Sequence, residues 1–292
     1  MPPDEVDPEA LLSALGVRDL TGLERVAGGE DTLLWRVTTP GGTHALRVMR
    51  PEQAPVARRE AAAMRAAAAA GVTVPRVEAE TLWRGRPAML LSWCPGRTVM
   101  SVVRERPWLL WPLARALGAA QARLNRVAAP AELLAEGEDW LDWAGPVEED
   151  LAARLGALPR RRDRLLHLDF HPFNTMTDGR SITAVLDWTN CCAGDPRADA
   201  ARTLSVLLLS PVPPGTPRVF GLLRRVMAAA WWRGYRDVAG ELAAMPLFQA
   251  WAGDALQRDW ARRVEDPGHW ATAAQLEPAR RWSTHWRRAA GV

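Results

Sequence analysis

The densest set of polar side chains in the sequence lies between residues 164 and 188. Asp169 precedes Asn174 by five residues, and Asp187 follows Asn174 by thirteen. Short β-type runs flank these positions, so loops between strands can direct all three side chains into one cleft. Phosphoryl transfer requires a carboxylate that orients the attacking hydroxyl, and oxygen ligands for a metal that bridges the phosphates. The pattern therefore predicts a phosphoryl-transfer site, with Mg²⁺ as the metal that such ligands favour.

The segment His167-Leu-Asp-Phe-His-Pro-Phe-Asn174, followed by Leu186-Asp187-Trp188, resembles the catalytic and metal-binding segments of the aminoglycoside-phosphotransferase and choline-kinase-like family. That family is related to the protein kinases. The resemblance implies an α+β, bilobal fold with a small mixed α/β amino-terminal lobe and a larger, mainly helical carboxy-terminal lobe. It also implies that Asp169 is the catalytic base, that Asn174 and Asp187 are magnesium ligands, and that His167 braces the catalytic loop.

A further match follows downstream. Gly194-Asp195-Pro196 resembles the Gly-Asp-Pro segment of the same family, and we expect Asp199 to cap or brace the catalytic loop. The alternative for the whole region is a histidine-rich turn between hairpin strands, with Asp187 merely exposed at a strand end. That alternative fits any one of these residues alone, whereas the ordered set of residue types favours the site.

The resemblance extends upstream to residues that would hold a nucleotide. Gly28 and Gly29 resemble the phosphate-covering turn of the family, where glycine lets backbone amides approach phosphate oxygens. Arg47 stands on the predicted strand where a kinase has its phosphate-pairing lysine, and Glu60 on the next helix would be its partner. Arginine departs from the kinase pattern, but it keeps its charge and can hold a carboxylate and a phosphate together. A plain β-turn, a surface arginine and a solvated glutamate are the alternatives.

Ser92, Trp93 and Cys94 precede a Pro95-Gly96 break in the pattern. By the resemblance they form the hinge whose backbone meets the purine, which would place Cys94 close to the nucleotide. We take the break as the boundary between two lobes. Residues 1–94 would be the nucleotide-binding lobe, and residues 95–292 the catalytic and substrate-binding lobe. The last eighty or so residues match nothing that we can interpret.

Hydrophobic periodicity predicts the elements that position these residues. Strands are expected at 33–39, 44–49, 73–77 and 88–93, and a helix from about residue 56 to residue 70. Short strands are expected within 164–188. The remainder should be mostly helical, with apolar periodicity in 108–127, 131–156, 199–209, 217–240 and 241–264.

Composition excludes several classes of protein. No apolar stretch approaches the roughly 20 residues that span a bilayer, and the acidic, proline-rich start is unlike a secretory signal, so the expected location is the cytoplasm. The three cysteines make neither a disulfide framework nor a metal-ligand spacing. All 37 basic residues are arginine, and the net charge of +3 is spread along the chain without the dense basic stripe of a nucleic-acid binder.

Two groups of residues bear on the substrate. The segment 131–150 holds eight acidic residues and no arginine, so a cationic substrate would gain from it; a solvated acidic helix face is the alternative. Five aromatic side chains could stack on a sugar or a quaternary ammonium, or could belong to the core. The acidic residues are Glu132, Glu136, Glu138, Asp139, Asp142, Glu148, Glu149 and Asp150, and the aromatic ones are Trp140, Trp143, Trp231, Trp232 and Tyr235.

The sequence therefore indicates a small-molecule kinase that moves the γ-phosphoryl group of ATP or GTP to a substrate hydroxyl, with Mg²⁺ as cofactor. A nucleotide triphosphate and a small hydroxylated compound, an amino sugar among the options, are the expected partners, without nucleic acid or membrane. One alternative is a catalytically idle nucleotide-binding regulator or scaffold on the same fold. The other is a protein kinase, which is disfavoured because no activation segment is recognisable between Asp187 and Gly194.

Overall fold

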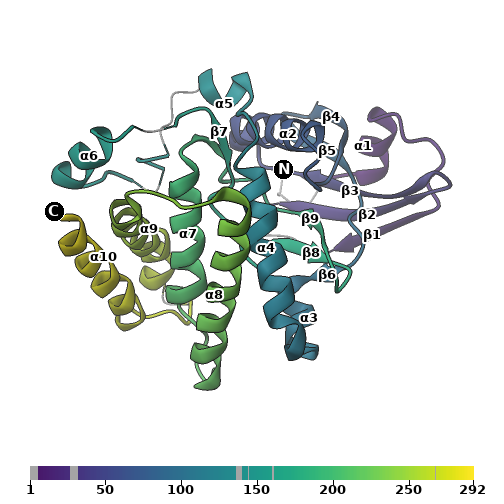
Figure 1. Ribbon diagram of the computed structural model, residues 1–292. Coiled ribbons are helices and arrows are strands. Elements are labelled where there is room, and N and C mark those ends of the chain that lie inside the picture. Colours follow the sequence, from purple (N-terminus) through teal and green to yellow (C-terminus); the bar gives the residue numbers. More distant parts are fainter. Residues whose placement is uncertain (1–5, 27–31, 136–139, 144, 160, 267) are drawn as a thin grey trace.

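A computed structural model describes residues 6–26, 32–135, 140–143, 145–159, 161–266 and 268–292 of the 292-residue chain. A sheet of five strands with two helices forms the amino-terminal part, and helices dominate the rest (Figure 1). The expected α+β class is confirmed. The predicted turn residues Gly28 and Gly29 lie outside the described residues.

The elements of the amino-terminal part are α1 (Pro8–Ala14), β1 (Gly22–Val26), β2 (Leu33–Thr39), β3 (Gly42–Val48), α2 (Ala54–Ala69), β4 (Val77–Trp83) and β5 (Arg86–Ser92). They are followed by β6 (Arg97–Thr98), α3 (Val99–Glu105), α4 (Leu110–Leu124), α5 (Ala131–Ala135), α6 (Glu149–Gly156), β7 (Arg164–Leu166), β8 (Thr175–Thr177), β9 (Ile182–Val185) and β10 (Cys192–Gly194). The last helices are α7 (Pro196–Leu209), α8 (Val219–Ala239), α9 (Met245–Glu265) and α10 (Glu277–Ala290).

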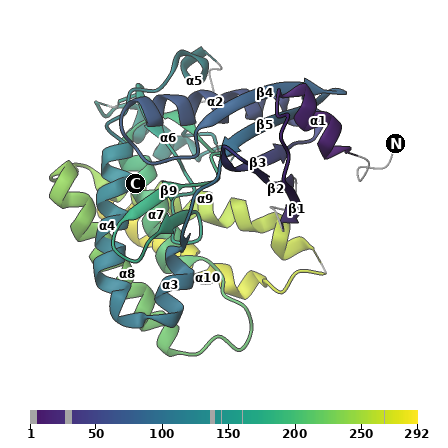
Figure 2. The same cartoon turned by 90° about the vertical axis from the view of Figure 1, so that its right-hand side faces the viewer.

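The five-stranded sheet has the order β1-β2-β3-β5-β4, and its neighbours pair antiparallel. Side chains alternate between its faces. Leu46 and Val48 of β3 belong to one apolar cluster with Leu11 and Leu12 of α1. Arg47, between them in sequence, therefore points to the opposite face, which α2 covers (Figures 1 and 2). The register of β3 thus determines that Arg47 faces the helix that carries Glu60.

Two predictions about elements are wrong in part. Residues 73–76 are not a strand: β4 begins at Val77, and the carbonyl of Thr73 accepts a hydrogen bond from the amide of Val185 in β9 instead of pairing within the large sheet. The extended pattern there reflects Pro75, because a residue before proline avoids the helical region even without a strand partner. In the described residues of the expected helical segment 131–156 the helices are α5 and α6, and Gly145, at φ 97°, and Pro146 lie between them.

Helices α4 and α8 lie side by side in the second part of the molecule (Figure 1). Their backbones approach closely at Gly118 of α4 and Gly234 of α8. A Cβ atom on Gly118 would lie 1.9 Å from the carbonyl oxygen of Trp231, and one on Gly234 would lie 1.9 Å from that of Arg115. Among the described residues, no helix is both long enough and apolar enough to cross a membrane.

The close approach of α4 and α8 gives a test of the packing. Gly118→Ala should destabilise the protein by about 1–3 kcal/mol or more, because the new methyl group meets rigid backbone and not a movable side chain. Gly221→Ala, in the exposed first turn of α8 with nothing within 4 Å, is the matched control and should change stability by less than about 1 kcal/mol. Urea unfolding of both variants measures the difference, and equal stabilities would contradict this packing.

Candidate active site

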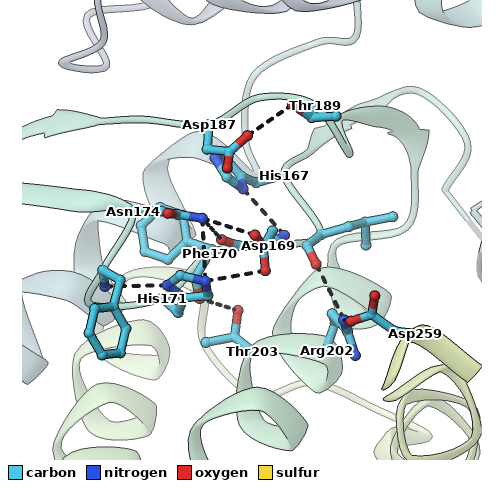
Figure 3. Close-up of polar contacts among 12 residues, drawn as sticks. His167, Asp169, Phe170, His171, Asn174, Asp187, Thr189, Arg202, Thr203 and Asp259 are labelled. Atoms are coloured by element: carbon cyan, nitrogen blue, oxygen red, sulfur yellow. Dashed lines mark hydrogen bonds and ion pairs between the residues drawn. The ribbon is translucent and has the colours of Figure 1, made fainter. Parts of the chain in front are cut away.

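Asp169 lies in the loop between β7 and β8, and both of its carboxylate oxygens have partners (Figure 3). The side-chain amide of Asn174 donates to Asp169 Oδ2 at 2.9 Å and to the Asp169 carbonyl at 3.1 Å. His171 Nε2 lies 3.3 Å from Asp169 Oδ1. The loop therefore holds the predicted base in one orientation through the predicted metal ligand and through a histidine that sequence analysis did not assign.

The protonation of Asp169 is determined by two opposing effects. Burial works to raise the pKa of its carboxyl, but the hydrogen bond and charge of His171, together with the charge of Arg202, hold that pKa below its usual range. Asp169 is therefore ionised at neutral pH. An ionised, oriented carboxylate can accept the proton of a hydroxyl that attacks phosphorus.

His167 is fully buried and links two segments of the site. Its Nδ1 accepts a hydrogen bond from the amide of Asp169 at 3.3 Å, and its Nε2 lies 3.0 Å from the carbonyl of Leu186. These two bonds require the proton on Nε2. Burial lowers the pKa of His167, although the carboxylates of Asp199, Asp169 and Asp187 act in the opposite direction. The ring therefore stays neutral and ties the catalytic loop to the residue that precedes Asp187, which is the bracing geometry expected from the sequence.

Asp199, in the first turn of α7, braces the same loop from behind. Its Oδ1 accepts from the amide of Leu168 at 2.8 Å, and its Oδ2 accepts from the amide of His167 at 3.3 Å. Leu168 has a φ of 57°, a left-handed conformation that costs about 1–3 kcal/mol for a residue of this type. On the other side of this strained residue, Arg202 Nε donates to its carbonyl at 3.4 Å. The predicted bracing by Asp199 is confirmed.

A buried polar network fixes Asp199 in turn. Asn125 at the end of α4 donates to Asp199 Oδ2 at 2.7 Å, and its own Oδ1 accepts from the hydroxyl of Tyr235 at 3.0 Å. Gln121, one turn earlier in α4, donates to Thr203 of α7 at 2.8 Å. Because buried polar groups are costly when unpaired, this network favours one arrangement of α4, α7 and α8 behind the loop.

Asn174 and Asp187 are brought together by strand pairing. Thr175 of β8 pairs with Val185 of β9 in antiparallel register, so the residues before β8 and after β9 lie at the same end of the hairpin. The amide of Leu186 donates to the carbonyl of Asn174 at 2.7 Å. Asp187 is exposed and has a φ of 59°. The distance between its Oδ1 and the hydroxyl oxygen of Thr189 is 2.9 Å (Figure 3).

The donor set at this end of the hairpin fits Mg²⁺. Asp187 offers an exposed carboxylate, and none of the hydrogen bonds found among the described residues uses Oδ1 of Asn174. Within those residues no three histidine, cysteine or carboxylate side chains are grouped so as to hold a metal ion by themselves. A cation here would take its other oxygens from phosphate and water, which is the coordination that Mg²⁺ prefers.

Arg47 and Glu60 form an ion pair at the sheet side of the site. Nη1 of Arg47 donates to Oε2 of Glu60, and Oε1 of Glu60 lies 2.9 Å from the hydroxyl of Thr189. Glu60 is fully buried, and this burial raises the pKa of its carboxyl above the usual value, against the opposing effects of Arg47 and Thr189. The structure therefore pairs the two residues that sequence analysis expected to be partners, and Thr189 connects them to Asp187.

The predicted hinge residues lie at the end of β5. The amide of Trp93 donates to the carbonyl of Thr43 at 3.2 Å, and the guanidinium of Arg36 lies 5.2 Å from the Trp93 ring centre. Ser92 closes the strand through its hydroxyl, which accepts from the amide of Arg76 at 2.9 Å. Burial raises the pKa of the Cys94 thiol to about 11, against the opposing charge of Arg76. Contact of these residues with a purine stays a prediction.

The residues considered for the substrate divide between core and surface. Trp140, Trp231 and Tyr235 are buried within apolar clusters, which favours the core interpretation for them. Trp143 is partly buried, and the guanidinium of Arg202 lies 5.1 Å from its ring centre. Of the acidic residues, Glu136, Glu138 and Asp139 lie outside the described residues, and Glu148 pairs with Arg287 at 2.9 Å.

Sequence analysis gave no role to Thr189, His171 or Arg202. His171 lies inside the matched motif, so its proximity to Asp169 could have been anticipated. Arg202 is one turn from Asp199 on α7, and its ion pair with Asp259 of α9 depends on helix packing that no local pattern reveals. A cavity of about 560 Å³, lined by Thr73, Arg123, Val185 and others, includes none of the predicted site residues.

The role of His171 predicts a change in pH dependence. In His171→Ala the hydrogen bond that lowers the pKa of Asp169 is lost while burial persists, so that pKa should rise. Protonation of Asp169 would then begin at higher pH, and the acid limb of kcat/KM should move upward relative to wild type. His285→Ala, on the exposed side of α10, is the control. An unchanged acid limb in His171→Ala would contradict this assignment.

Comparisons with known proteins agree with the geometry. A comparison with curated proteins gives no match, but many solved structures share the fold, among them the following three. A protein from Ralstonia eutropha JMP134 assigned to the aminoglycoside phosphotransferases has a TM-score of 0.63 at 18% identity, covering 97% of this chain and 94% of that chain. A thermostable mutant of aminoglycoside phosphotransferase APH(4)-Ia, in ternary complex with AMP-PNP and hygromycin B, has a TM-score of 0.63 at 17% identity, covering 97% and 99%.

Spectinomycin phosphotransferase APH(9)-Ia, in complex with ADP and spectinomycin, has a TM-score of 0.61 at 10% identity, covering 97% of this chain and 98% of that chain. At such identities these structures show the shared fold. The profile of the phosphotransferase enzyme family matches residues 22–218, which is more than half of the sequence. The span includes the catalytic loop, the β8–β9 hairpin and the Arg47–Glu60 pair, and the chain belongs to the phosphotransferase enzyme family.

Proposed function

We propose that the protein is a small-molecule kinase that transfers the γ-phosphoryl group of ATP or GTP to a substrate hydroxyl. The observation that carries this proposal is the contact between Asp169 and Asn174, in a loop that His167 joins to Leu186 beside Asp187. This arrangement supports the proposal, because it would hold a proton acceptor and two oxygen ligands for a metal close together. The family membership and the nucleotide complexes of two structural relatives support the same conclusion.

We assign the nucleotide to the junction between residues 1–94 and residues 95–292. Arg47 is held by Glu60 at the face of the sheet toward α2, and its guanidinium can offset the charge that develops on the phosphates. The hinge residues Ser92, Trp93 and Cys94 would meet the base. Magnesium bound to Asn174 and Asp187 would supply the remaining positive charge, a largely electrostatic contribution.

The acceptor hydroxyl is oriented by Asp169. Its carboxylate is ionised and held on both oxygens, so it can take the hydroxyl proton as the oxygen attacks phosphorus. We propose cationic amino sugars as the first acceptors to examine, since hygromycin B and spectinomycin occupy two relatives of this fold. Exposed acidic residues of this chain, Glu149 and Asp150 at the start of α6 among them, would favour such substrates.

Metal-dependent nucleotide binding is the first property to measure. ATP or GTP with Mg²⁺ should raise the stability of the wild-type protein by mass action, about 2.7 kcal/mol at a hundredfold excess over Kd. The increment should largely disappear in Asp187→Ala and persist in Asp163→Ala, which removes an exposed carboxylate outside the site. Thermal unfolding with Mg²⁺ and with EDTA checks this. No increment with either nucleotide would favour the idle-scaffold alternative.

Asp169→Asn separates binding from chemistry. The variant keeps the shape of the side chain but cannot accept the hydroxyl proton, so turnover should fall roughly 10²–10⁴-fold. Nucleotide affinity should stay nearly unchanged, because the side chain of Asp169 is not among the predicted nucleotide or metal ligands. A coupled assay for nucleoside diphosphate with hydroxylated substrates measures the rate, with Asp163→Asn as the control. Full turnover in Asp169→Asn would show that another group is the base.

A further inference from the structure

The cavity of about 560 Å³ lies between the end of α2, one face of α4 and the β8–β9 hairpin. Helix α4 lies beside β9 (Figures 1 and 2). The volume falls within the range of about 300–1,000 Å³ that is typical of small-molecule sites. None of the described residues that we assign to catalysis, metal or nucleotide lines it. The cavity can therefore hold an organic molecule at a place separate from the active site.

The wall of the cavity next to α2 is held by hydrogen bonds to β9. Gly71 follows α2 in a left-handed conformation, at φ 79°, which lets the chain leave the helix axis. The carbonyl of Thr73 then accepts from the amide of Val185 at 3.0 Å, and the hydroxyl of Thr73 donates to the carbonyl of Ile182 at 3.4 Å. All four residues line the cavity, so this wall is fixed by the fold.

Three alanines of α4 form another wall. Ala116, Ala119 and Ala120 line the cavity, and their spacing of three and four residues places them on one face of the helix. Val72 and Ile182 add further apolar surface. Because alanine leaves open the space that a larger side chain would fill, this part of the cavity suits an apolar ring system.

The charged residues at the cavity all have the same sign. Arg123, Arg126 and Arg180 line it, and no aspartate or glutamate does so within the described part of the chain. The whole sequence is nearly balanced, with 37 basic and 34 acidic residues, so three positive charges without a counter-charge distinguish this surface. A bound anion would offset the repulsion among them.

The guanidinium groups have donors to offer a ligand. The side chains of Arg123 and Arg180 make no hydrogen bond or ion pair with any residue that the structure describes. Arg126 donates from Nη2 to the carbonyl of Val238 near the end of α8. Arg47 of the active site, by contrast, is held by a buried carboxylate. A guanidinium that is not already paired can bind a carboxylate or a phosphate through two parallel hydrogen bonds.

We propose that this cavity is a binding site for a small organic anion that has a carboxylate or phosphate group and an apolar ring system. The anionic group meets Arg123, Arg126 and Arg180, and the rings lie against the alanines of α4. The inference goes beyond the proposed function and does not rest on it, because the two sites share none of the described residues.

Titration calorimetry with four compounds tests the charge and the rings separately. Two of them, 1-naphthyl phosphate and 1-naphthoate, carry both features, whereas inorganic phosphate lacks the rings and 1-naphthol lacks the charge. At least one naphthyl anion should bind more tightly than inorganic phosphate and 1-naphthol, and the tighter of the two identifies the anionic group. Absence of binding by both anions at about 1 mM would overturn the proposal. Equal affinity for 1-naphthol would overturn it too.

Arg123→Gln and Arg180→Gln test the anion contacts. Each variant should weaken binding of the tighter naphthyl anion about tenfold, the equivalent of one hydrogen bond to a charged group, and the double variant should weaken it further. Arg225→Gln is the matched control, because Arg225 is an exposed arginine of α8 that also lacks a partner among the described residues and does not line the cavity. It should keep the wild-type affinity. Wild-type affinity in the double variant would contradict the site.

Ala120→Phe tests the apolar part. Ala120 is partly buried and lines the cavity, so the new ring should occupy the space proposed for the ligand and weaken the naphthyl anion about tenfold. Thermal unfolding without ligand checks that the variant is folded. Unchanged affinity in the folded variant would show that the rings of the ligand lie elsewhere and would overturn the proposal.

ADP with Mg²⁺ distinguishes this cavity from the predicted nucleotide site. Binding of the naphthyl anion should persist when ADP with Mg²⁺ is saturating, because none of the described residues assigned to the nucleotide lines the cavity. Displacement by ADP would place the anion at the nucleotide site, which would overturn this inference and leave the kinase assignment standing. A protein that binds the anion in the cavity but neither ADP nor ATP would instead contradict the proposed function alone.

Discussion

The carboxylate of Asp199 is the interaction on which the site depends. It accepts hydrogen bonds from Asn125 and from the amides of His167 and Leu168. Two consecutive backbone amides are thereby fixed immediately before Asp169, and the left-handed conformation of Leu168 is held against its strain. The helices behind the loop position one buried carboxylate. Through the polar network of α4, α7 and α8, the packing of these helices determines where the backbone before Asp169 lies.

The same dependence explains how the two parts of the molecule meet. His167 joins the loop that carries Asp169 to the backbone at Leu186 through a hydrogen bond. Three residues after Leu186, Thr189 bonds to Glu60, which is paired with Arg47 of the large sheet. Few bonds are involved, and each connects residues from different elements. The orientation of Asp169 and that of the Arg47 guanidinium are therefore linked through hydrogen bonds and not through apolar packing alone.

The sequence was informative where residue type and order carry the chemistry. The motif around Asp169 predicted the loop, and the family resemblance predicted the pairing of Arg47 with Glu60, because both depend on the order of residue types along the chain. The pairing of Tyr235 with Asn125, 110 residues apart, could not be foreseen, since only the packing of α8 against α4 brings them together. The false strand at 73–76 arose because proline makes an extended backbone without supplying a partner strand.

Arginine at position 47 differs from lysine in chemical reactivity as well as in the permanence of its charge. In the proposed binding mode, a lysine at this position would be a primary amine beside the nucleotide, open to acylation, carbamylation or reaction with an aldehyde. A guanidinium resists all of these reactions, and the sequence contains no lysine elsewhere. Nucleotide analogues that label kinases by acylating a lysine side chain would therefore not label this protein. Acetylation of a lysine side chain cannot regulate it either.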